Sequence, residues 1–292
     1  MTSLTANLLT LDAVGDEDRL LVKRAVEGSR DALHRLVERH QPFVYNIALK
    51  MFGRREDAQD LTQEVFVKVI TSLKTFRHAS SFRTWLYRMT VNHFLKTRRR
   101  ALELSVESFE TYFDAIAAVP VEEPSGEFSP TDETIEELRL RCTSGMLMCL
   151  DRDQRIAFIL GAMFGVSQRV GAEVLGISPE NFRVRLHRAR RDLYSWMNSR
   201  CGLVNEANPC RCSKKTRGYV KLGVVDPNRL VFNADYVVRI EALTRTGASD
   251  AMQAVEDLHE RIFLSHPLQL SGNTVVDEIL GNETVRSFFA VS

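Results

Sequence analysis

The chain lacks the long apolar runs that would place it in a membrane. None of its 292 residues lies in an apolar run of about eighteen, the length that a membrane-spanning helix needs. The N-terminus has no basic start followed by an apolar core, so it does not resemble a signal peptide. We therefore expect a cytoplasmic protein that does not contact a membrane.

Disulfide frameworks and catalytic motifs are missing as well. The five cysteines are an odd number at irregular spacing, so free thiols are expected in a reducing compartment. The sequence has no glycine-rich phosphate-binding loop, no H-E-x-x-H motif and no pattern that pairs a nucleophile with a base. Helical periodicity dominates wherever a period is visible, and it predicts an all-α protein without catalytic residues.

The near-neutral net charge of +1 is a sum over segments of strongly opposite charge. Residues 81–100 carry six Lys or Arg and no carboxylate, whereas residues 101–138 carry eleven carboxylates and no Lys or Arg. The net charge of the whole chain therefore does not indicate a nucleic-acid partner. Any argument for such a partner has to rest on the charge of these local segments.

Periodicity and composition divide the chain into five segments. Apolar residues follow a helical spacing before residue 100, although Pro42 is expected to interrupt one helix. Residues 101–134 lose that spacing and gain Pro120, Pro124 and Pro130, which favours a linker with little fixed structure. The predicted segments are a flexible tail (1–18), a helical domain (19–100), an acidic linker (101–134), a second helical domain (135–199) and a C-terminal extension (200–292).

A helix-turn-helix is predicted near the end of the second domain. A short helix ends at Gly176, Ser178 can cap the next helix, and Pro179 occupies its first position. Four apolar side chains of this second helix share a narrow arc, which must therefore face the core. They are Phe182, Leu186, Ala189 and Leu193.

The opposite face of that second helix is basic and long enough to enter a DNA major groove. Its N-terminal residues would reach base edges, while later arginines would bind phosphates. The alternative is a solvated arginine-rich face, which is what charged runs usually are. The candidate contacts to duplex DNA are Glu180, Asn181, Arg183, Val184, His187, Arg188 and Arg191.

The basic stretch at 81–100 differs because aromatic residues are interleaved with its cations. An unpaired base loses its stacking neighbours, and an aromatic face replaces them at roughly 1–3 kcal/mol per base. The alternative is that Phe82, Trp85 and Met89 are core residues. The candidate contacts to unpaired DNA are Arg83, Trp85, Arg88, Asn92, His93, Lys96, Arg98 and Arg99.

Binding energy limits what this stretch can do alone. Opening about ten base-pair steps costs on the order of 14 kcal/mol, whereas two stacked bases return only about 2–6 kcal/mol. The stretch can therefore nucleate strand opening at a weak AT-rich step, but a larger machine has to hold the bubble.

The order of these parts resembles a known family. "DAQDLTQEVFVKVITSL", then "SFRTWLYRMTVNHFLKTRRR", an acidic linker and "LDRDQRIAFIL" followed by the helix-turn-helix are similar to the extracytoplasmic-function (ECF) group of the bacterial sigma-seventy family. The likeness covers residues 19–199. It implies a promoter-specificity subunit of RNA polymerase that consists of two helical domains on a flexible linker and requires no cofactor.

The resemblance also implies a role for each motif. The stretch at 81–100 would recognise and open the minus-ten element, the helix from Pro179 would read the minus-thirty-five element, and the linker would thread towards the polymerase channel. The partners would be core RNA polymerase, through its beta-prime clamp and beta flap, promoter DNA, and an anti-sigma factor. The clamp would bind Asp57, Asp60, Gln63, Glu64 and Phe66, which otherwise belong to an ordinary amphipathic helix.

Two departures from the family pattern affect the helix-turn-helix. Its first helix has "QRVGAEVL" where an acidic pair and Ile-Ala are common, and Gly171 weakens a helix by about 1 kcal/mol. "SPENFRVR" also replaces the commoner small-residue start of the second helix. No minus-thirty-five sequence can therefore be transferred to this chain.

The extension begins with three cysteines within twelve residues, Cys201, Cys210 and Cys212. They are candidate ligands of a structural or sensory Zn²⁺, with Cys149, Cys142 or a histidine as the fourth. The alternatives are redox-active thiols beside basic residues, or inert thiols. The extension resembles regulatory ones of this group, including cysteine-bearing extensions linked to metal response.

Beyond residue 217 the pattern predicts a small helical module that packs on the second domain and controls activity. One helical stripe contains Ala251, Val255, Leu258 and Ile262, and another helix begins near Val275. The alternative function for the whole chain is a metal- or thiol-sensing helix-turn-helix repressor that acts without polymerase. Binding to core polymerase separates the two.

Overall fold

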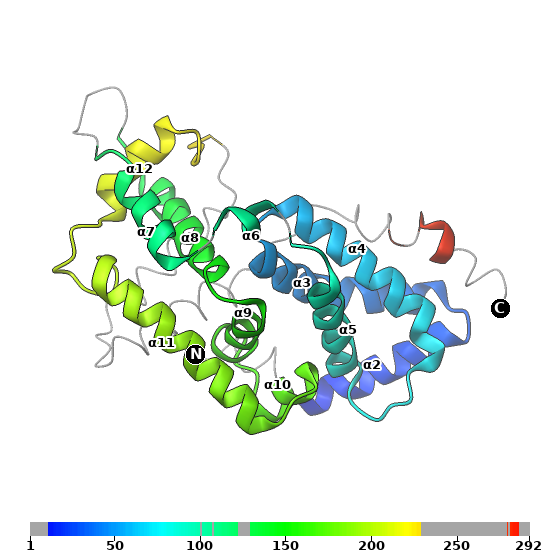
Figure 1. Ribbon diagram of the computed structural model, residues 1–292. Coiled ribbons are helices and arrows are strands. Elements are labelled where there is room, and N and C mark those ends of the chain that lie inside the picture. The colour runs from blue at the N-terminus through cyan, green and yellow to red at the C-terminus, as the bar shows by residue number, and fades with distance from the viewer. Residues whose placement is uncertain are drawn as a thin grey trace. The chain divides into compact units, whose positions relative to one another are not determined.

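The computed structural model describes residues 11–99, 101–106, 108–121, 129–228, 279 and 281–285. Within these residues all regular secondary structure is helical apart from one isolated β-bridge (Figure 1). The predicted all-α class is confirmed. The expected helix near Ala251 lies outside the described residues, as does the expected helix from Val275 except for Ile279, which is helical.

The chain forms two compact units that interleave along the sequence. Unit 1 contains Met1–Arg98, Val166–Arg183 and Gln269–Ser292, and unit 2 contains Arg99–Gly165 and Val184–Leu268. The first helix of the helix-turn-helix therefore groups with the first predicted domain, and the second helix runs from one unit into the other. The five segment boundaries given above stay a prediction.

Among the described residues, unit 1 consists mainly of helices that surround one apolar core. They are α2 (Leu11–Val26), α3 (Arg30–Phe52), α4 (Arg55–Ser72), η1 (Leu73–Thr75), α5 (Phe82–Lys96) and α10 (Gln168–Leu175). The Ser29 side chain caps α3 by accepting from Ala32 N at 3.2 Å, and Gly53 ends it in the left-handed region at φ 72°. Phe52 and Phe94 meet in the core with ring centroids 5.2 Å apart.

The expected interruption at Pro42 is wrong, because α3 continues through it. A proline inside a helix costs about 3 kcal/mol. Apolar side chains are buried on both sides of it, Leu36 and Val37 before and Val44 and Ile47 after. Each contributes about 1.5–3 kcal/mol when fully buried, so tertiary packing outweighs the local cost.

Unit 2 contains most of the other helices that the structure describes. They are α6 (Ala101–Ser105), α7 (Phe109–Ala118), α8 (Asp132–Met148), α9 (Arg152–Phe158), the π-helix η2 (Ile159–Met163), most of α11 (Pro179–Arg200) and α12 (Cys212–Lys221). Figure 1 shows α12 beside α8 and α7. None of the described helices of either unit is long and apolar enough to span a membrane.

The expectation of little fixed structure across 101–134 is wrong for its first part, which contains α6 and α7. Phe109, Phe113 and Ile116 recur at four and three residues and are at most 9% exposed. Phe109 and Phe113 stack on Trp196 of α11, with ring centroids 5.9 and 6.1 Å apart. This helical stripe was present in the sequence but hidden by its acidic and proline-containing surroundings.

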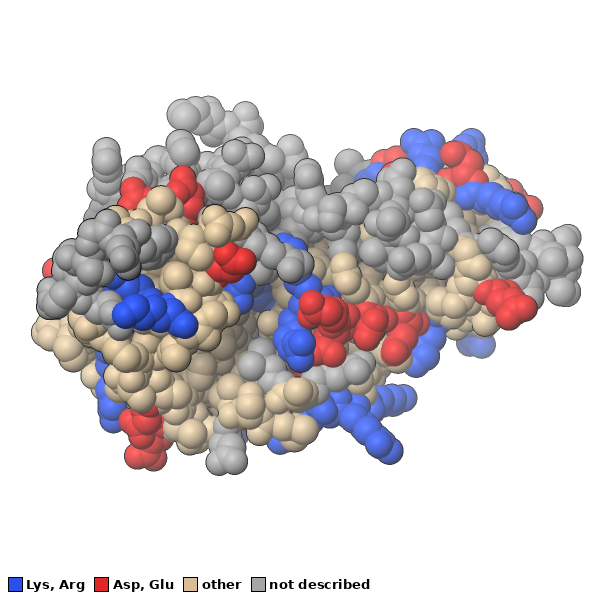
Figure 2. All heavy atoms as spheres, turned by 90° about the horizontal axis from the view of Figure 1, so that it is seen from above, with Lys and Arg blue, Asp and Glu red and all other residues tan. Residues whose placement is uncertain are grey.

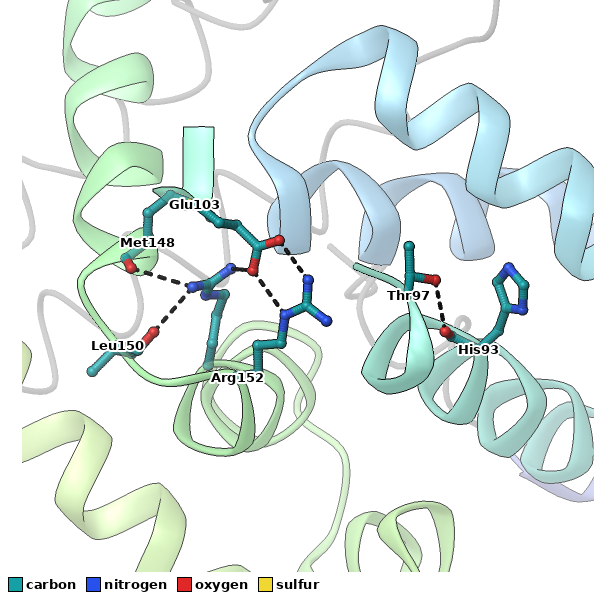
Figure 3. Close-up of polar contacts among 7 residues, drawn as sticks. His93, Thr97, Glu103, Met148, Leu150 and Arg152 are labelled. Atoms are coloured by element: carbon teal, nitrogen blue, oxygen red, sulfur yellow. Dashed lines mark hydrogen bonds and ion pairs between the residues drawn. The ribbon is translucent and has the colours of Figure 1, made fainter. Parts of the chain in front are cut away.

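A buried ion pair fixes the start of the linker (Figure 3). The Glu103 carboxylate accepts from Arg152 at 2.7 and 3.0 Å and from Arg155 Nη1 at 2.9 Å. Arg155 also donates to the carbonyls of Met148 and Leu150 at 3.2 and 3.0 Å. Burial lowers the pKa of Arg155, while the Glu103 carboxylate opposes that shift. The charge of Arg155 and its two terminal nitrogens thus have partners within unit 2.

The first part of the extension packs on the linker. The Lys215 ammonium of α12, on a residue only 8% exposed, donates to Ala117 O at 2.9 Å and Val119 O at 2.5 Å. These carbonyls lie at the C-terminal end of α7, where a cation is favoured by the helix dipole. A Cβ at Gly218 would meet Pro120 O at 2.4 Å, so α12 approaches the linker backbone closely.

Both charge signs reach the surface. In Figure 2 acidic and basic side chains lie next to one another at the centre of the view. The low net charge therefore comes from mixed charges and not from an uncharged surface.

Glu103→Gln should lower the free energy of unfolding of unit 2 by about 3–5 kcal/mol, because it leaves buried Arg155 without its counter-charge. Urea unfolding followed by Trp196 fluorescence in a Trp85→Phe background reports on unit 2 alone, since the chain has two tryptophans. Asp114→Asn is the control, because the ion pair that Asp114 makes with Arg200 at 3.8 Å is exposed to solvent. Its loss should cost less than about 1 kcal/mol. Equal effects of the two substitutions would contradict the anchoring role of Glu103.

Candidate nucleic-acid interface

Helix α5 buries one face and exposes the other. The Ser81 side chain caps it by accepting from Thr84 N at 3.0 Å. Phe82, Leu86 and Phe94 are at most 3% exposed and anchor the helix in the core of unit 1. The candidate residues lie away from that core: Asn92, Lys96, Arg98 and Arg99 are exposed, and Arg83, Trp85, Arg88 and His93 are half-buried.

Trp85 stands at the edge of an aromatic cluster. Its ring centroid lies 5.2 Å from Phe76 and 5.8 Å from Phe82. The core alternative is confirmed for Phe82, which is 3% exposed, whereas Trp85 and Met89 keep partly accessible surfaces. The cluster packs against the Trp85 ring, while Trp85 as a whole stays partly exposed.

His93 connects the two candidate surfaces of unit 1. Lys68 Nζ lies 2.6 Å from His93 Nδ1, and an ammonium can only donate. Nδ1 therefore accepts, and the proton sits on Nε2, which donates to Glu64 Oε2 at 2.5 Å. This hydrogen-bond chain joins α4 to α5.

Arg88 is partly engaged within unit 1. Its Nε donates to the Glu173 carbonyl of α10 at 3.2 Å, and Nη2 lies 3.4 Å from the Glu173 carboxylate. Both side chains are about two-fifths exposed, 41% and 42%. Such an exposed pair is worth at most about 1 kcal/mol, so a phosphate can replace it at little cost.

Four of the five candidate polymerase-binding residues on α4 reach the surface, and one is buried. Asp60 and Glu64 are exposed and Asp57 and Gln63 half-buried, as a docking face requires. Phe66 is only 1% exposed and lies in the core, so it cannot touch a partner directly. Its membership of the apolar stripe of α4 was the signal that should have excluded it.

The predicted faces of α11 are confirmed. Phe182, Leu186, Ala189 and Leu193 are at most 6% exposed. Gly176 ends α10 at φ 66°, and the Ser178 hydroxyl accepts from Asn181 N at 3.2 Å, which caps α11. The seven candidate DNA contacts are all exposed: Glu180, Asn181, Arg183, Val184, His187, Arg188 and Arg191.

The arginines of α11 differ in their partners. Arg185 pairs with Asp153 of α9 at 3.1 Å, and Arg191 pairs with its neighbour Asp192 at 2.8 Å. Within the described part of the chain no ion pair of Arg188 is found. The guanidinium of Arg188 is therefore more available to bind a phosphate than those of Arg185 and Arg191.

Gly171 has a packing role that the family pattern did not suggest. A Cβ at this position of α10 would lie 2.4 Å from two ring carbons of Phe182. Phe182 is fully buried at 0% exposure, so its ring has no room to move away. Glycine therefore lets α10 and the first turn of α11 approach each other closely.

All five cysteines are free thiols. Cys149, expected as a fourth ligand, stands apart: its Sγ donates to Ser108 O at 3.7 Å, and burial raises its pKa to about 12. Burial also raises the pKa of Cys201, Cys210 and Cys212, the last to about 11. Since the thiolate is the reactive form, these shifts weigh against the redox-active alternative.

The comparisons with known proteins agree on one family. The family described as Sigma-70 region 2 matches residues 36–102, and Sigma-70, region 4 matches residues 140–193. The ECF RNA polymerase sigma factor SigE of Mycolicibacterium smegmatis is 31% identical over 56% of this chain and 60% of its own length. The ECF RNA polymerase sigma-E factor of Haemophilus influenzae is 31% identical over 59% of this chain and 91% of its own.

Two further matches concern one protein. RNA polymerase sigma factor CnrH of Cupriavidus metallidurans is 31% identical over 63% of this chain and 96% of its own. The solved structure titled "Structure of CnrH in complex with the cytosolic domain of CnrY" aligns with a TM-score of 0.45 and 26% identity, over 63% of this chain and 99% of that one.

Gly171→Ala should destabilise the protein although alanine is the better helix former. Helix propensity favours alanine by about 1 kcal/mol, but overpacking against the buried Phe182 ring costs about 1–3 kcal/mol. Urea unfolding followed by circular dichroism should show a lower midpoint. The free energy of unfolding should fall by up to about 2 kcal/mol. Arg169→Ala on the exposed face of the same helix is the control and should be neutral or slightly stabilising. A stabilised Gly171→Ala variant would show that the close approach is not required.

Proposed function

The chain belongs to the ECF group of the sigma-70 family of RNA polymerase sigma factors, and we propose that its two exposed basic helices divide promoter recognition between them. As an initiation factor it acts with core RNA polymerase and promoter DNA, without catalytic chemistry or a required cofactor. The observation that carries the proposal is the pair of faces on α5 and α11, each packed on one side and cationic on the other.

Helix α11 is proposed to read the minus-thirty-five element as duplex DNA. Its exposed N-terminal side chains would reach base edges, because the first turns of such a helix enter the major groove. They are Glu180, Asn181, Arg183 and Val184. Arg188, further along the helix, would bind phosphate and help to set the register.

Helix α5 is proposed to hold the minus-ten element after its bases unpair. The partly accessible Trp85 ring offers a stacking face worth roughly 1–3 kcal/mol per base. Exposed Asn92 and Lys96 lie one and two turns after Arg88 and would follow the strand. Because this return is small beside the cost of a bubble, the polymerase has to supply the rest.

Helix α4 is proposed as the docking face for the beta-prime clamp, through Asp57, Asp60, Gln63 and Glu64. The Glu64–His93 hydrogen bond supports a rigid relation between this face and α5. The second helical domain would bind the beta flap. An anti-sigma factor is a further proposed partner on the family resemblance alone, and a cytoplasmic location follows from the proposed partners.

The polymerase-independent repressor is not favoured. Such a repressor keeps its DNA double-stranded and has no use for the region 2 match at residues 36–102. Run-off transcription with purified bacterial core polymerase on promoter fragments, with and without this protein, tests the proposal. New discrete transcripts are expected. The absence of transcripts together with absence of co-elution with core polymerase would overturn it.

Arg188→Ala should weaken binding at many promoters alike and make its salt dependence shallower by about one unit in the slope of log K against log salt, because one phosphate contact is lost. Arg185→Ala is a matched control on the same helix, since Arg185 is paired with Asp153. Fluorescence anisotropy of the holoenzyme on several promoters at several salt concentrations measures both. Loss at one promoter only would assign Arg188 to base reading instead.

A further inference from the structure

Arg88 lies in the middle of the candidate strand-binding face of α5. Trp85 precedes it by about one turn and Asn92 follows it by about one turn, so the three side chains share one side of the helix. Trp85 and Arg88 are half-buried, and Asn92 is exposed. An unpaired strand that stacks on Trp85 and continues towards Asn92 therefore passes the Arg88 guanidinium.

The Arg88 guanidinium already has an anionic partner on α10, which packs against α5 within unit 1 (Figure 1). Its Nε donates to the Glu173 carbonyl at 3.2 Å, and its Nη2 donates to Glu173 Oε1 at 3.4 Å. Nε and Nη2 form one edge of the planar guanidinium, and two parallel hydrogen bonds from such an edge are the way arginine binds a phosphate. Glu173 thus occupies the two donors that a DNA phosphate would use.

The end of α10 adds to the negative charge of Glu173. Glu173 lies in the last turn of this helix, which ends at Gly176. The last carbonyls of a helix carry the partial negative charge of its dipole. The Glu173 carbonyl is one of them, and it accepts from Gly176 N at 3.3 Å as well as from Arg88. A carboxylate and a helix C-terminus together therefore give Arg88 an anion with two oxygen acceptors, as a phosphate would.

The exposure of the Arg88–Glu173 pair makes it exchangeable. Its two side chains are 41% and 42% exposed, whereas those of the Arg155–Glu103 pair in unit 2 are 3% and 2% exposed. Removing one partner of a buried pair leaves an uncompensated charge, so such a pair fixes a fold. An exposed pair contributes little to stability and is weakened by salt. Arg88 can therefore pass from Glu173 to a phosphate without disturbing the core of unit 1.

We propose that Glu173 imitates a DNA phosphate at Arg88 and lowers the affinity of α5 for single-stranded DNA while α10 packs against α5. This inference rests on the proposed function of α5 and adds a residue that tunes it. Glu173 acts only through Arg88 and makes no contact with the strand itself. A strand that binds Arg88 has to displace the Glu173 carboxylate, and this exchange of partners reduces the net gain from the phosphate contact.

The competition links strand binding to the helix-turn-helix, because α10 is the first helix of that motif. A strand that takes Arg88 from Glu173 removes one contact between α5 and α10. By thermodynamic linkage, the strand weakens the packing of α10 by the same factor by which that packing weakens strand binding. A movement of α10 away from α5 would likewise leave Arg88 to the strand.

The test measures binding of a labelled oligothymidine strand to the full-length chain without polymerase, by fluorescence anisotropy at several low salt concentrations. Glu173→Gln should tighten binding about two- to fivefold, the range that an exposed ion pair contributes. It should also steepen the salt dependence, because no freed carboxylate then takes up a cation when the phosphate binds. Glu56→Gln is the matched control: it removes the same charge from unit 1, from an exposed pair with Arg54 at 3.9 Å. Its effect should be smaller.

A double-mutant cycle isolates the contact. In an Arg88→Ala chain, Glu173→Gln should change strand binding no more than Glu56→Gln does. Without any nucleic acid, Glu173→Gln should speed the labelling of Arg88 by phenylglyoxal, followed by peptide mass spectrometry, and Glu56→Gln should not.

The outcomes separate the inference from the function on which it rests. If Arg88→Ala leaves strand binding unchanged, the proposed function of α5 fails and the inference fails with it. If Arg88→Ala weakens binding but Glu173→Gln acts equally with and without Arg88, only the inference is overturned. Unchanged labelling of Arg88 in the Glu173→Gln chain would overturn it as well.

Discussion

The buried carboxylate of Glu103 is the constraint on which unit 2 depends. A carboxylate that is 2% exposed has to be neutralised, and two arginines of α9 meet it from the facing side. Glu103 follows Arg99 by only four residues in the sequence. Arg99 is exposed to solvent, whereas the Glu103 carboxylate is buried. The start of the linker is thereby fixed, and α7 can stack on Trp196 from a defined position.

The same division between a packed face and a free face governs both basic helices. Arginine and lysine stay in solvent because burying an unpaired charge costs far more than burying an apolar side chain returns. On α11 the free face holds polar and basic residues that suit duplex DNA. On α5 it adds the rim of an aromatic cluster, of which Trp85 remains partly accessible. One folding rule therefore yields two exposed surfaces of different chemical character.

Local periodicity predicted the all-α class, the helix-turn-helix and the buried face of α11, because each is written into spacings of three and four residues. Local periodicity gave wrong predictions where contacts between residues far apart in the sequence determine the local structure. Pro42 lies inside a helix because the core holds both halves. Phe109, Phe113 and Ile116 form a helix despite acidic neighbours. The roles of the exposed side chains are not encoded in burial, and they rest on the family and on the proposals above.

Permanganate reactivity of thymines in the minus-ten element tests the central claim most directly, because it reports unpaired bases. It should be measured with core polymerase and either this protein or its Asn92→Ala/Lys96→Ala variant, alongside footprinting of the minus-thirty-five element. We predict reactive thymines with the unaltered protein, and lost reactivity with retained minus-thirty-five protection for the variant. Unchanged reactivity in the variant, or equal loss at both elements, would contradict the assignment of strand opening to α5.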